Sequence, residues 1–147
     1  FGGNVVTPYV QEVQKLVEKA GERVKFTGYI ENQKLYRYYQ SADIQVIPSL
    51  WEEAAGLIAI EGMLSGLPLI ITKSGGMIEY APSNVAVWID RDNIIPNLEA
   101  TIIQLADDKE KRKEMSELSL EQAKEFPKKK FYEDYIEVFE HEGTRKR

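Results

Sequence analysis

The sequence predicts an α/β domain in which helices cover both faces of a parallel β-sheet. Apolar runs of four or five residues recur along the chain without polar alternation, which is the pattern of strands buried on both sides. Segments with apolar residues at helical spacing separate these runs, as expected for right-handed crossovers between parallel strands. At 147 residues the chain is long enough for one domain with its own core. The expected fold is therefore a Rossmann-like, doubly wound parallel sheet.

The first elements expected are a helix, a strand and a second helix. Thr7, followed by proline, is typical of a helix start, and apolar residues then recur at helical spacing until Gly21. A short strand is expected over 23–27 and is ended by Gly28. Asn32 is expected to cap the helix that follows.

The rest of the chain continues this alternation. Three more strands are expected from their apolar runs, at 44–47, 69–72 and 85–89. Helices are expected at about 55–65, in a short turn after Gly76, and over about 94–142 with breaks near Asp107 and Pro127. We expect residues 1–147 to form a single domain that is incomplete at its N-terminus, because Phe1 opens the chain inside what resembles a strand end.

Composition excludes several classes of function. A net charge of −5 argues against sequence-independent binding of nucleic acid, so no nucleic-acid partner is expected. The chain has no cysteine, so it has neither a disulfide framework nor a thiolate zinc site. The single histidine, His141, lies near the C-terminus, so a Ser/His/Asp triad or a multi-histidine metal site would need residues from outside the chain. No apolar run approaches the length of a membrane span.

Three segments of unusual composition follow predicted strands. They are residues 28–30, 48–56 and 73–76, and all three contain glycine. Loops at strand ends are often rich in glycine and proline for turn geometry alone. Ligands of open parallel sheets bind beyond the carboxyl ends of the strands, however, and the joint placement of these segments on that rim favours a site.

The third predicted helix carries a carboxylate in an unusual place. Leu57, Ile58, Leu64 and Ser65 mark its expected inward stripe, and Glu61 lies on the same stripe. A carboxylate is costly to bury there unless it meets hydrogen-bond donors or ligand hydroxyls. The alternative is a helix rotated far enough to expose Glu61.

The start of the same helix is suited to an anion. The backbone N–H groups of Gly56, Leu57 and Ile58 would point out of the first turn, where the helix dipole also favours negative charge. Glu53 precedes this turn and Glu61 follows it, and both can accept hydrogen bonds from hydroxyls. A sugar joined to a nucleotide through a diphosphate presents the complementary groups.

These residues resemble the signature of a known enzyme family. Segment 48–70, with Glu53 and Glu61 separated by seven residues, is similar to the large retaining glycosyltransferase family of GT-B fold (glycosyltransferase family 4, or glycosyl transferases group 1). Residues 24–28, Ala42-Asp43, and Ser74-Gly75-Gly76 followed by Glu79 also fit the family. The resemblance covers roughly residues 1–79 and identifies the chain as the C-terminal, donor-binding half of such an enzyme.

The resemblance implies roles by position. Binding of the donor sugar and phosphate is assigned to Glu53, Ala55, Gly56, Leu57 and Ile58, with Glu53 as the catalytic residue. Nucleotide binding is assigned to Gly28, Tyr29, Ile30 and Glu61, the glutamate contacting the ribose. In the family a hexosyl group moves to an acceptor hydroxyl with retained configuration, and stabilising the nucleoside diphosphate that leaves is the main catalytic task.

The resemblance also implies partners and a cellular setting. The donor is a UDP-, GDP- or ADP-sugar, and no other cofactor and no metal is required. A glycan or lipid-linked acceptor would bind through an N-terminal domain absent from this chain. The expected role is bacterial cell-surface polysaccharide or glycolipid synthesis, in the cytoplasm or at the inner face of the membrane, with membrane contact only through the absent half.

Several departures from the family pattern stand out. Ala55 replaces a usual aromatic residue, Gly62 replaces a usual alanine, and Ile78 replaces a frequent proline. The family's phosphate-binding arginine and lysine lie on the first strand and loop, and no equivalent precedes Phe1. We therefore expect the isolated chain to have little or no transferase activity.

Other functions remain open. A sugar-nucleotide epimerase or hydrolase would use a related fold, and a non-catalytic nucleotide-binding module would leave Glu61 a structural role. Asp90 and Asp92 follow a predicted strand as Asp-x-Asp, which another class of glycosyltransferase uses to hold a divalent metal on the donor. Capping of the helix that begins just afterward is the competing interpretation of these two residues.

Overall fold

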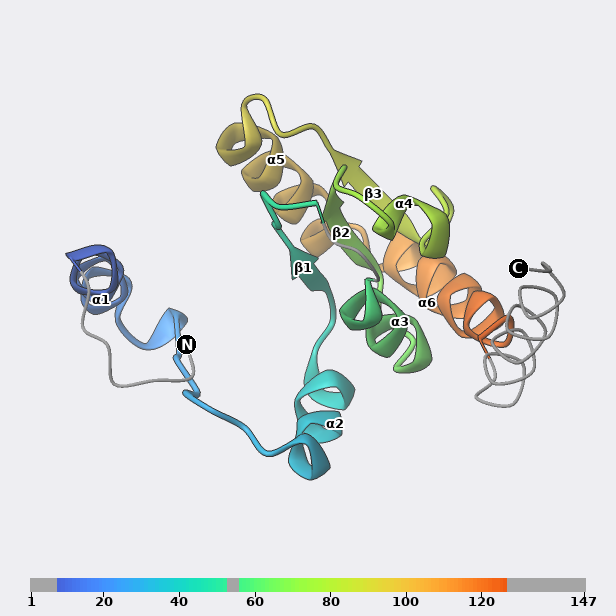
Figure 1. The fold of residues 1–147 in the computed structure, drawn as a ribbon, viewed down its shortest axis with the longest axis horizontal. Coiled ribbons are helices and arrows are strands. Elements are labelled where there is room, and N and C mark those ends of the chain that lie inside the picture. The colour runs from blue at the N-terminus through green and yellow to red at the C-terminus, as the bar shows by residue number, and fades with distance from the viewer. Residues whose placement is uncertain (1–7, 53–55, 127–147) are drawn as a thin grey trace, which may run out of the picture. The chain divides into compact units, whose positions relative to one another are not determined.

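The computed structural model describes residues 8–52 and 56–126 (Figure 1). The chain divides into two compact units, residues 1–37 and 38–147. Each unit is described by itself. Thr7, Glu53, Ala55 and Pro127 lie outside the described residues, so the expected cap at Thr7 and the expected helix break at Pro127 stay predictions.

The first unit contains a helix and an extended segment. Helix α1 (Pro8–Ala20) is followed by a 3₁₀ turn (Gly21–Arg23), and Gly21 takes a φ of 64°, which favours glycine at a helix end. The predicted helix is confirmed, but the strand expected over 23–27 is wrong. Arg23 belongs to the turn, and Val24 is extended without a strand beside it in the described part of this unit. An extended chain becomes a strand only by pairing with a neighbour.

Helix α2 (Asn32–Ser41) runs across the boundary between the units. It begins at Asn32 itself, one residue earlier than a helix capped by Asn32 would begin. Its last residues, from Tyr38, belong to the second unit. There Ser41 Oγ donates a hydrogen bond of 3.0 Å to the carbonyl of Tyr38 near the end of the helix.

A parallel sheet forms the centre of the second unit. Strands β1 (Gln45–Ile47), β2 (Leu69–Thr72) and β3 (Ala86–Ile89) lie in the order β1-β2-β3, and both pairs are parallel. All four residues of β2 are buried, as expected for a central strand covered on both faces. These strands match the three expected from apolar runs to within one residue at each end.

Helices connect and cover these strands. The connections β1-to-β2 and β2-to-β3 contain α3 (Leu57–Leu64) and α4 (Met77–Tyr80), and the sheet is followed by α5 (Ile94–Asp107) and α6 (Lys109–Ala123). Asp108 separates the last two helices and caps α6, because its Oδ1 accepts a hydrogen bond of 2.8 Å from the Lys111 amide. The break predicted near Asp107 is therefore confirmed.

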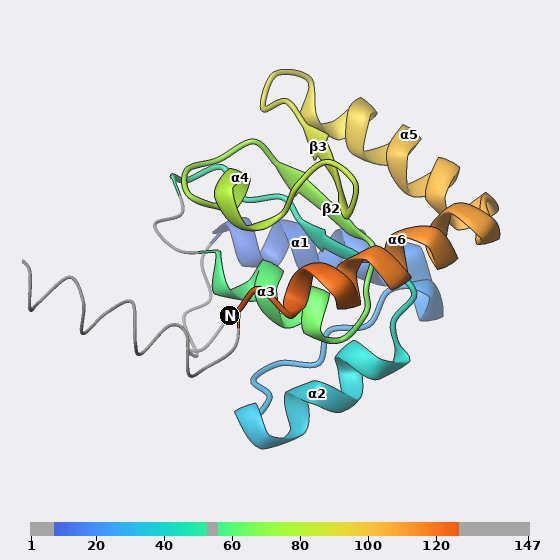
Figure 2. The same ribbon diagram turned by 90° about the vertical axis from the view of Figure 1, so that its right-hand side faces the viewer.

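The core has two halves, one on each face of the sheet. Leu69 and Ile71 of β2 pack with residues of α3, α4 and the end of α6, whereas Ile70 packs with Leu105 of α5 and Met115 of α6. Successive strand residues point to opposite faces, so one buried strand supplies both halves. Figures 1 and 2 show α5 on one side of the strands and α3 on the other. The predicted doubly wound α/β class is confirmed.

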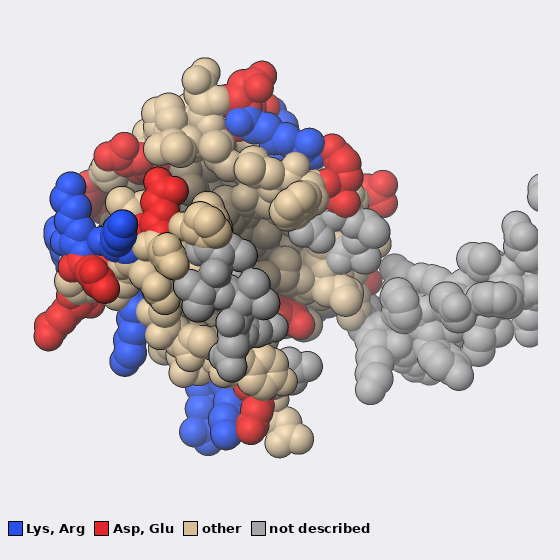
Figure 3. All heavy atoms as spheres, turned by 60° about the vertical axis from the view of Figure 1, so that its left-hand side comes forward, with Lys and Arg blue, Asp and Glu red and all other residues tan. Residues whose placement is uncertain are grey.

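The described surface is charged and locally paired. Lysine and arginine side chains are interspersed with acidic ones on the face drawn in Figure 3. Exposed ion pairs such as Lys111–Glu114 (2.9 Å) join neighbouring turns of one helix and add little to stability. None of the described helices is both long enough and apolar enough to cross a bilayer.

Candidate donor-binding site

The carboxyl ends of the three strands meet at one edge of the sheet. Residues 48–52 follow β1, residues 73–76 follow β2, and residues 90–93 follow β3. The predicted meeting of segments 48–56 and 73–76 is therefore confirmed for their described parts. Segment 28–30 belongs to the first unit, so its place beside this edge stays a prediction.

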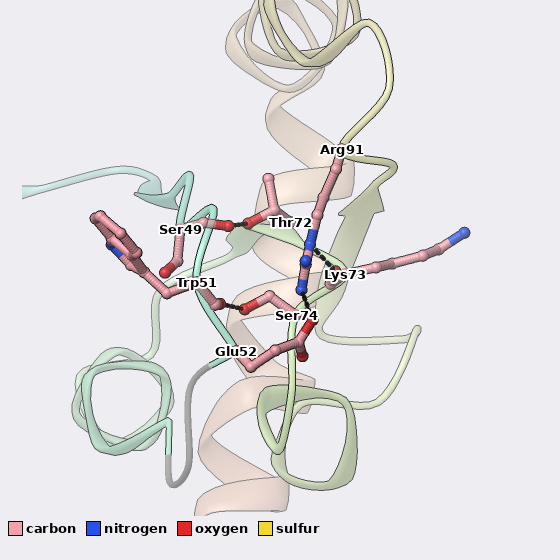
Figure 4. A network of polar contacts seen from close by, with 7 residues as sticks. All are labelled: Ser49, Trp51, Glu52, Thr72, Lys73, Ser74 and Arg91. Carbon is pink, nitrogen blue, oxygen red and sulfur yellow. Dashed lines mark hydrogen bonds and ion pairs between the residues drawn. The ribbon is translucent and has the colours of Figure 1, made fainter.

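Two buried hydroxyls hold the loop after β1 against β2. Thr72 Oγ1 donates to the carbonyl of Ser49 (Figure 4). The Thr72 hydroxyl also lies 3.4 Å from the carbonyl of Ile47. Ser74 Oγ donates to the carbonyl of Trp51. Both hydroxyl residues are almost fully buried, so each also satisfies a polar group that burial would otherwise make costly. The loop that leads toward α3 is thus fastened by side chains of the neighbouring strand end.

Arg91 adds a third attachment from the end of β3. Its Nη2 pairs with the carboxylate of Glu52, and its Nε donates to the carbonyl of Lys73 at 3.0 Å (Figure 4). The Arg91 guanidinium, followed by the backbone amide of Gly75, holds the pKa of the Glu52 carboxyl below its usual range. One arginine therefore connects the loops after all three strands.

The Asp-x-Asp sequence has neither a capping nor an evident metal-binding arrangement. Asp90 Oδ1 forms an ion pair with Lys73 Nζ at 2.7 Å. The N-cap of α5 is Asn93, which has φ 58° and ψ 35° and makes no side-chain cap hydrogen bond. The capping interpretation is thus wrong. Within the part of the chain that the structure describes, no three His, Cys, Asp or Glu residues form a cluster suited to a metal ion.

Helix α3 is rotated relative to the sequence expectation. The residues that face inward are Ala59, Gly62 and Met63, whereas Leu57 and Leu64 are 63% and 57% exposed. The predicted inward stripe of Leu57, Ile58, Leu64 and Ser65 is therefore wrong, and the alternative in which Glu61 is exposed is the one observed.

Close packing explains this rotation. A Cβ atom at Gly62 would lie 1.7 Å from Gln45 Oε1 and 2.8 Å from Leu69 Cδ2, so a side chain fits here only if the ends of Gln45 and Leu69 move. Ala59 and Gly62 on the inner face let the helix lie close to the strands, and Met63 beside them is fully buried. Leu57, Ile58 and Leu64 are left exposed.

The first turn of α3 leaves two backbone donors available. The carbonyl of Gly56 accepts hydrogen bonds from the amides of Ala59 (2.8 Å) and Ile60 (3.3 Å). The amides of Leu57 and Ile58 precede these and have no acceptor within the helix, as is general for a first turn. Gly56 is required here because an added Cβ would lie 2.5 Å from Met77 Cγ at the start of α4.

Glu61 has a hydrogen-bond partner that sequence reasoning missed. Tyr39 of α2 donates its hydroxyl hydrogen to Glu61 Oε2 at 2.8 Å, and Gln45 Nε2 donates to the carbonyl of Ile58 at 3.1 Å. Burial, and then the hydrogen bond to Glu61, raise the pKa of Tyr39 to about 12. The apolar spacing of α2 signals that Tyr39 faces inward, but nothing in the sequence signals which acceptor its hydroxyl meets.

The remaining predicted residues fall into two groups. Glu53 and Ala55 lie outside the described residues. Gly28 has a φ of 66°, Tyr29 is 79% exposed, and Gly28 lines a hollow beside α1 within the first unit. Their roles toward a nucleotide base stay predictions.

The fold is that of an α/β protein in which the carboxyl ends of the parallel strands meet at one edge of the sheet. The chain matches the family described as glycosyl transferases group 1 over residues 3–122. It therefore belongs to this family.

Two of the following three relatives are named as glycosyltransferases. The chain is 35% identical over 68 residues to an uncharacterized glycosyltransferase of Methanocaldococcus jannaschii (46% of this chain, 17% of the relative). It is 28% identical over 142 residues to spore coat protein SA of Bacillus subtilis (95% and 38%). It is 32% identical over 105 residues to the D-inositol 3-phosphate glycosyltransferase of Corynebacterium diphtheriae (71% and 24%). The chain thus spans less than two fifths of each of these relatives.

Proposed function

We propose that this chain is the donor-binding half of a retaining hexosyltransferase that uses a nucleotide diphosphate sugar. The observation that carries the proposal is the geometry of α3, which has two amides at its start without an acceptor among the described residues and a carboxylate on its exposed face. The amides at a helix start bind an anion, and a carboxylate accepts hydrogen bonds from a pair of hydroxyls. Group 1 glycosyltransferases use nucleotide-sugar donors, which carry both groups in one molecule.

Each part of the donor has a proposed partner. The diphosphate lies at the amides of Leu57 and Ile58, where Gly56 allows close approach, and the ribose hydroxyls donate to Glu61. Glu53, three residues before Gly56, contacts the donor hexose and is the proposed catalytic residue. Gly28, Tyr29 and Ile30 border the base, and the backbone at Ala55 contributes to the sugar pocket.

The chemistry proposed for the site is stabilisation of a leaving group. When the bond from the anomeric carbon to the diphosphate breaks, negative charge develops on the phosphate oxygens. Fixed N–H donors at a helix start need no reorganisation to meet that charge. Thr72, Ser74 and Arg91 hold the described part of the loop that precedes this turn, at Ser49, Trp51 and Glu52.

The wider setting is part of the proposal. Residues 1–147 act as one domain of a two-domain enzyme whose N-terminal domain binds a glycan or lipid-linked acceptor, and the isolated chain is nearly inactive. The donor is a UDP-, GDP- or ADP-sugar, without a required metal. The enzyme works in the cytoplasm or at the inner membrane face, in synthesis of surface polysaccharide or glycolipid. The family match and the names of the relatives support transfer, and the acceptor stays open.

The test is a product analysis of the intact two-domain enzyme, incubated with each donor with and without a panel of sugar and lipid-linked acceptors. The proposal expects a glycosylated acceptor of retained configuration and free nucleoside diphosphate, and EDTA should not reduce the rate. Altered or hydrolysed donor in the absence of acceptor would instead indicate an epimerase or hydrolase. Donor binding that Glu61→Gln leaves untouched would show that this carboxylate has only a structural role.

A further inference from the structure

Three side chains from different elements converge on α3. Tyr39 comes from α2, Gln45 from β1, and Glu61 from α3 itself. The Tyr39 hydroxyl donates to Glu61 Oε2 at 2.8 Å, and Gln45 Nε2 donates to the Ile58 carbonyl at 3.1 Å. Twenty-two and thirteen residues of sequence separate the partners, so these bonds fix α3 against the rest of the second unit.

The contact with Tyr39 engages only one oxygen of the carboxylate. Glu61 is exposed, and Tyr39 is the one side chain among the described residues that hydrogen-bonds its carboxylate, since Ser65 Oγ donates to the Glu61 backbone carbonyl instead. The terminal torsion of a glutamate is intrinsically broad, so an exposed carboxylate samples many orientations. A hydroxyl held 2.8 Å from Oε2 restricts that torsion, and Oε1 has no hydrogen-bond partner among the described residues.

The ring of Tyr39 gives the hydroxyl a fixed base. The side chain is partly buried and packs against the core cluster that contains Ala59 and Met63 of α3. A phenylalanine would fill the same space, so packing alone does not account for the hydroxyl. What the hydroxyl adds is a donor aimed at the acidic group of the neighbouring helix.

Gln45 supports α3 from beneath. Its Oε1 is buried and has no hydrogen-bond partner among the described residues, and it occupies the space that a Cβ at residue 62 would need. Gln45 is also close enough to the Tyr39 phenol to affect its pKa, in the direction opposite to burial. The Gln45 amide therefore limits how closely α3 approaches the sheet, while Tyr39 orients the Glu61 carboxylate.

We propose that Tyr39 is a positioning residue that orients Glu61 toward the ribose hydroxyls of the nucleotide, with the Gln45–Gly62 contact holding α3 at the matching height. This inference rests on the proposed role of Glu61 in nucleotide binding. Tyr39 itself does not touch the nucleotide. Its effect is expected in how strongly the protein distinguishes a ribose from a deoxyribose.

The experiment is calorimetric titration of the intact two-domain enzyme with UDP, GDP and ADP, and with the 2′-deoxy form of whichever binds. The variants are Tyr39→Phe, Glu61→Ala and their combination. Tyr38→Phe is the matched control, because Tyr38 is the preceding residue and is 48% exposed. Thermal unfolding of each variant checks that the fold is kept.

Tyr39→Phe should raise Kd for the ribonucleotide about 3- to 10-fold, the effect of one hydrogen bond. It should also reduce the preference for ribose over 2′-deoxyribose, whereas Tyr38→Phe changes neither. In the Glu61→Ala background Tyr39→Phe should change Kd by less than about twofold, because the group that it orients is gone.

Two results would overturn the inference and leave the proposed function standing. In one, Glu61→Ala weakens binding while Tyr39→Phe leaves both Kd and ribose preference unchanged. In the other, Tyr39→Phe has the same effect with and without Glu61. If the wild-type enzyme binds none of the three nucleotides, the proposed function itself fails, and this inference fails with it.

Discussion

Replacing Gly62 by alanine tests how α3 is seated on the sheet. In an open helix alanine is favoured over glycine by about 1 kcal/mol. Here the new Cβ would lie 1.7 Å from Gln45 Oε1 and 2.8 Å from Leu69 Cδ2. Overpacking of this kind costs about 1–3 kcal/mol. Expelling the Gln45 amide also breaks its hydrogen bond to the Ile58 carbonyl, a loss of about 1 kcal/mol. The net expectation is a decrease of about 1–3 kcal/mol in the free energy of unfolding.

A double-mutant cycle with Gln45→Ala separates the causes. Gln45→Ala alone should cost about 1 kcal/mol, the lost hydrogen bond. In that background Gly62→Ala should be less destabilising by at least about 1 kcal/mol, because only the flexible end of Leu69 remains in the way. The assay is urea unfolding followed by circular dichroism. The reasoning is refuted if Gly62→Ala stabilises the wild type, or if its effect is the same in both backgrounds.

Three further predictions concern the site and its neighbours. Leu57→Glu should weaken nucleoside diphosphate binding at least about 10-fold with little change in melting temperature, because it places negative charge beside the anion. Leu64→Glu, at the other end of the same helix, is the control. Equal loss of binding in both variants would contradict the anion site. Arg91→Ala should raise the pKa of the Glu52 carboxyl toward its ordinary value in a ¹³C NMR titration. In the wild type the contribution of this pair to stability is present above the ordinary glutamate pKa and is lost as pH falls through the lowered value. An unchanged Glu52 titration in the variant would refute the contact. Tyr39 should titrate with a pKa of about 12 by ultraviolet absorbance, and Tyr39→Phe should remove that component of the titration. The contribution of Tyr39 to the free energy of unfolding is complete below pH 10 and is lost as pH rises through 12. A free energy of unfolding that does not fall in this window would contradict the raised pKa.

Much of the second unit could be predicted from the sequence because its signals are local. Leu69–Thr72 is a short apolar run between glycine- and proline-containing segments, and such a run has few alternatives to a buried strand. Asp108 precedes a helical pattern and accepts the expected backbone hydrogen bond. The family signature likewise depends on residue types at fixed spacing, and the match over residues 3–122 confirms the family.

The errors arose where a residue's partner lies elsewhere in the chain. The rotation of α3 depends on the fit of Gly62 over Gln45, and periodicity ranks glycine as neutral while it ranks Leu57 and Leu64 as core. The expected strand at 23–27 has the composition of a strand but lacks a neighbour in its unit. The partner of Asp90 is Lys73, which lies seventeen residues earlier in the chain, and no local pattern indicates that pair.

The central claim is that α3 and its surroundings bind the nucleotide of a sugar donor. The most direct measurement is an amide chemical-shift titration of this chain with UDP, GDP and ADP, each without metal, repeated on the intact two-domain enzyme. The account predicts saturable shifts with one of these nucleotides at Leu57, Ile58 and Glu61, while Leu64 stays unmoved. Saturable binding with shifts elsewhere, or no binding of any of the three to the intact enzyme, would contradict it.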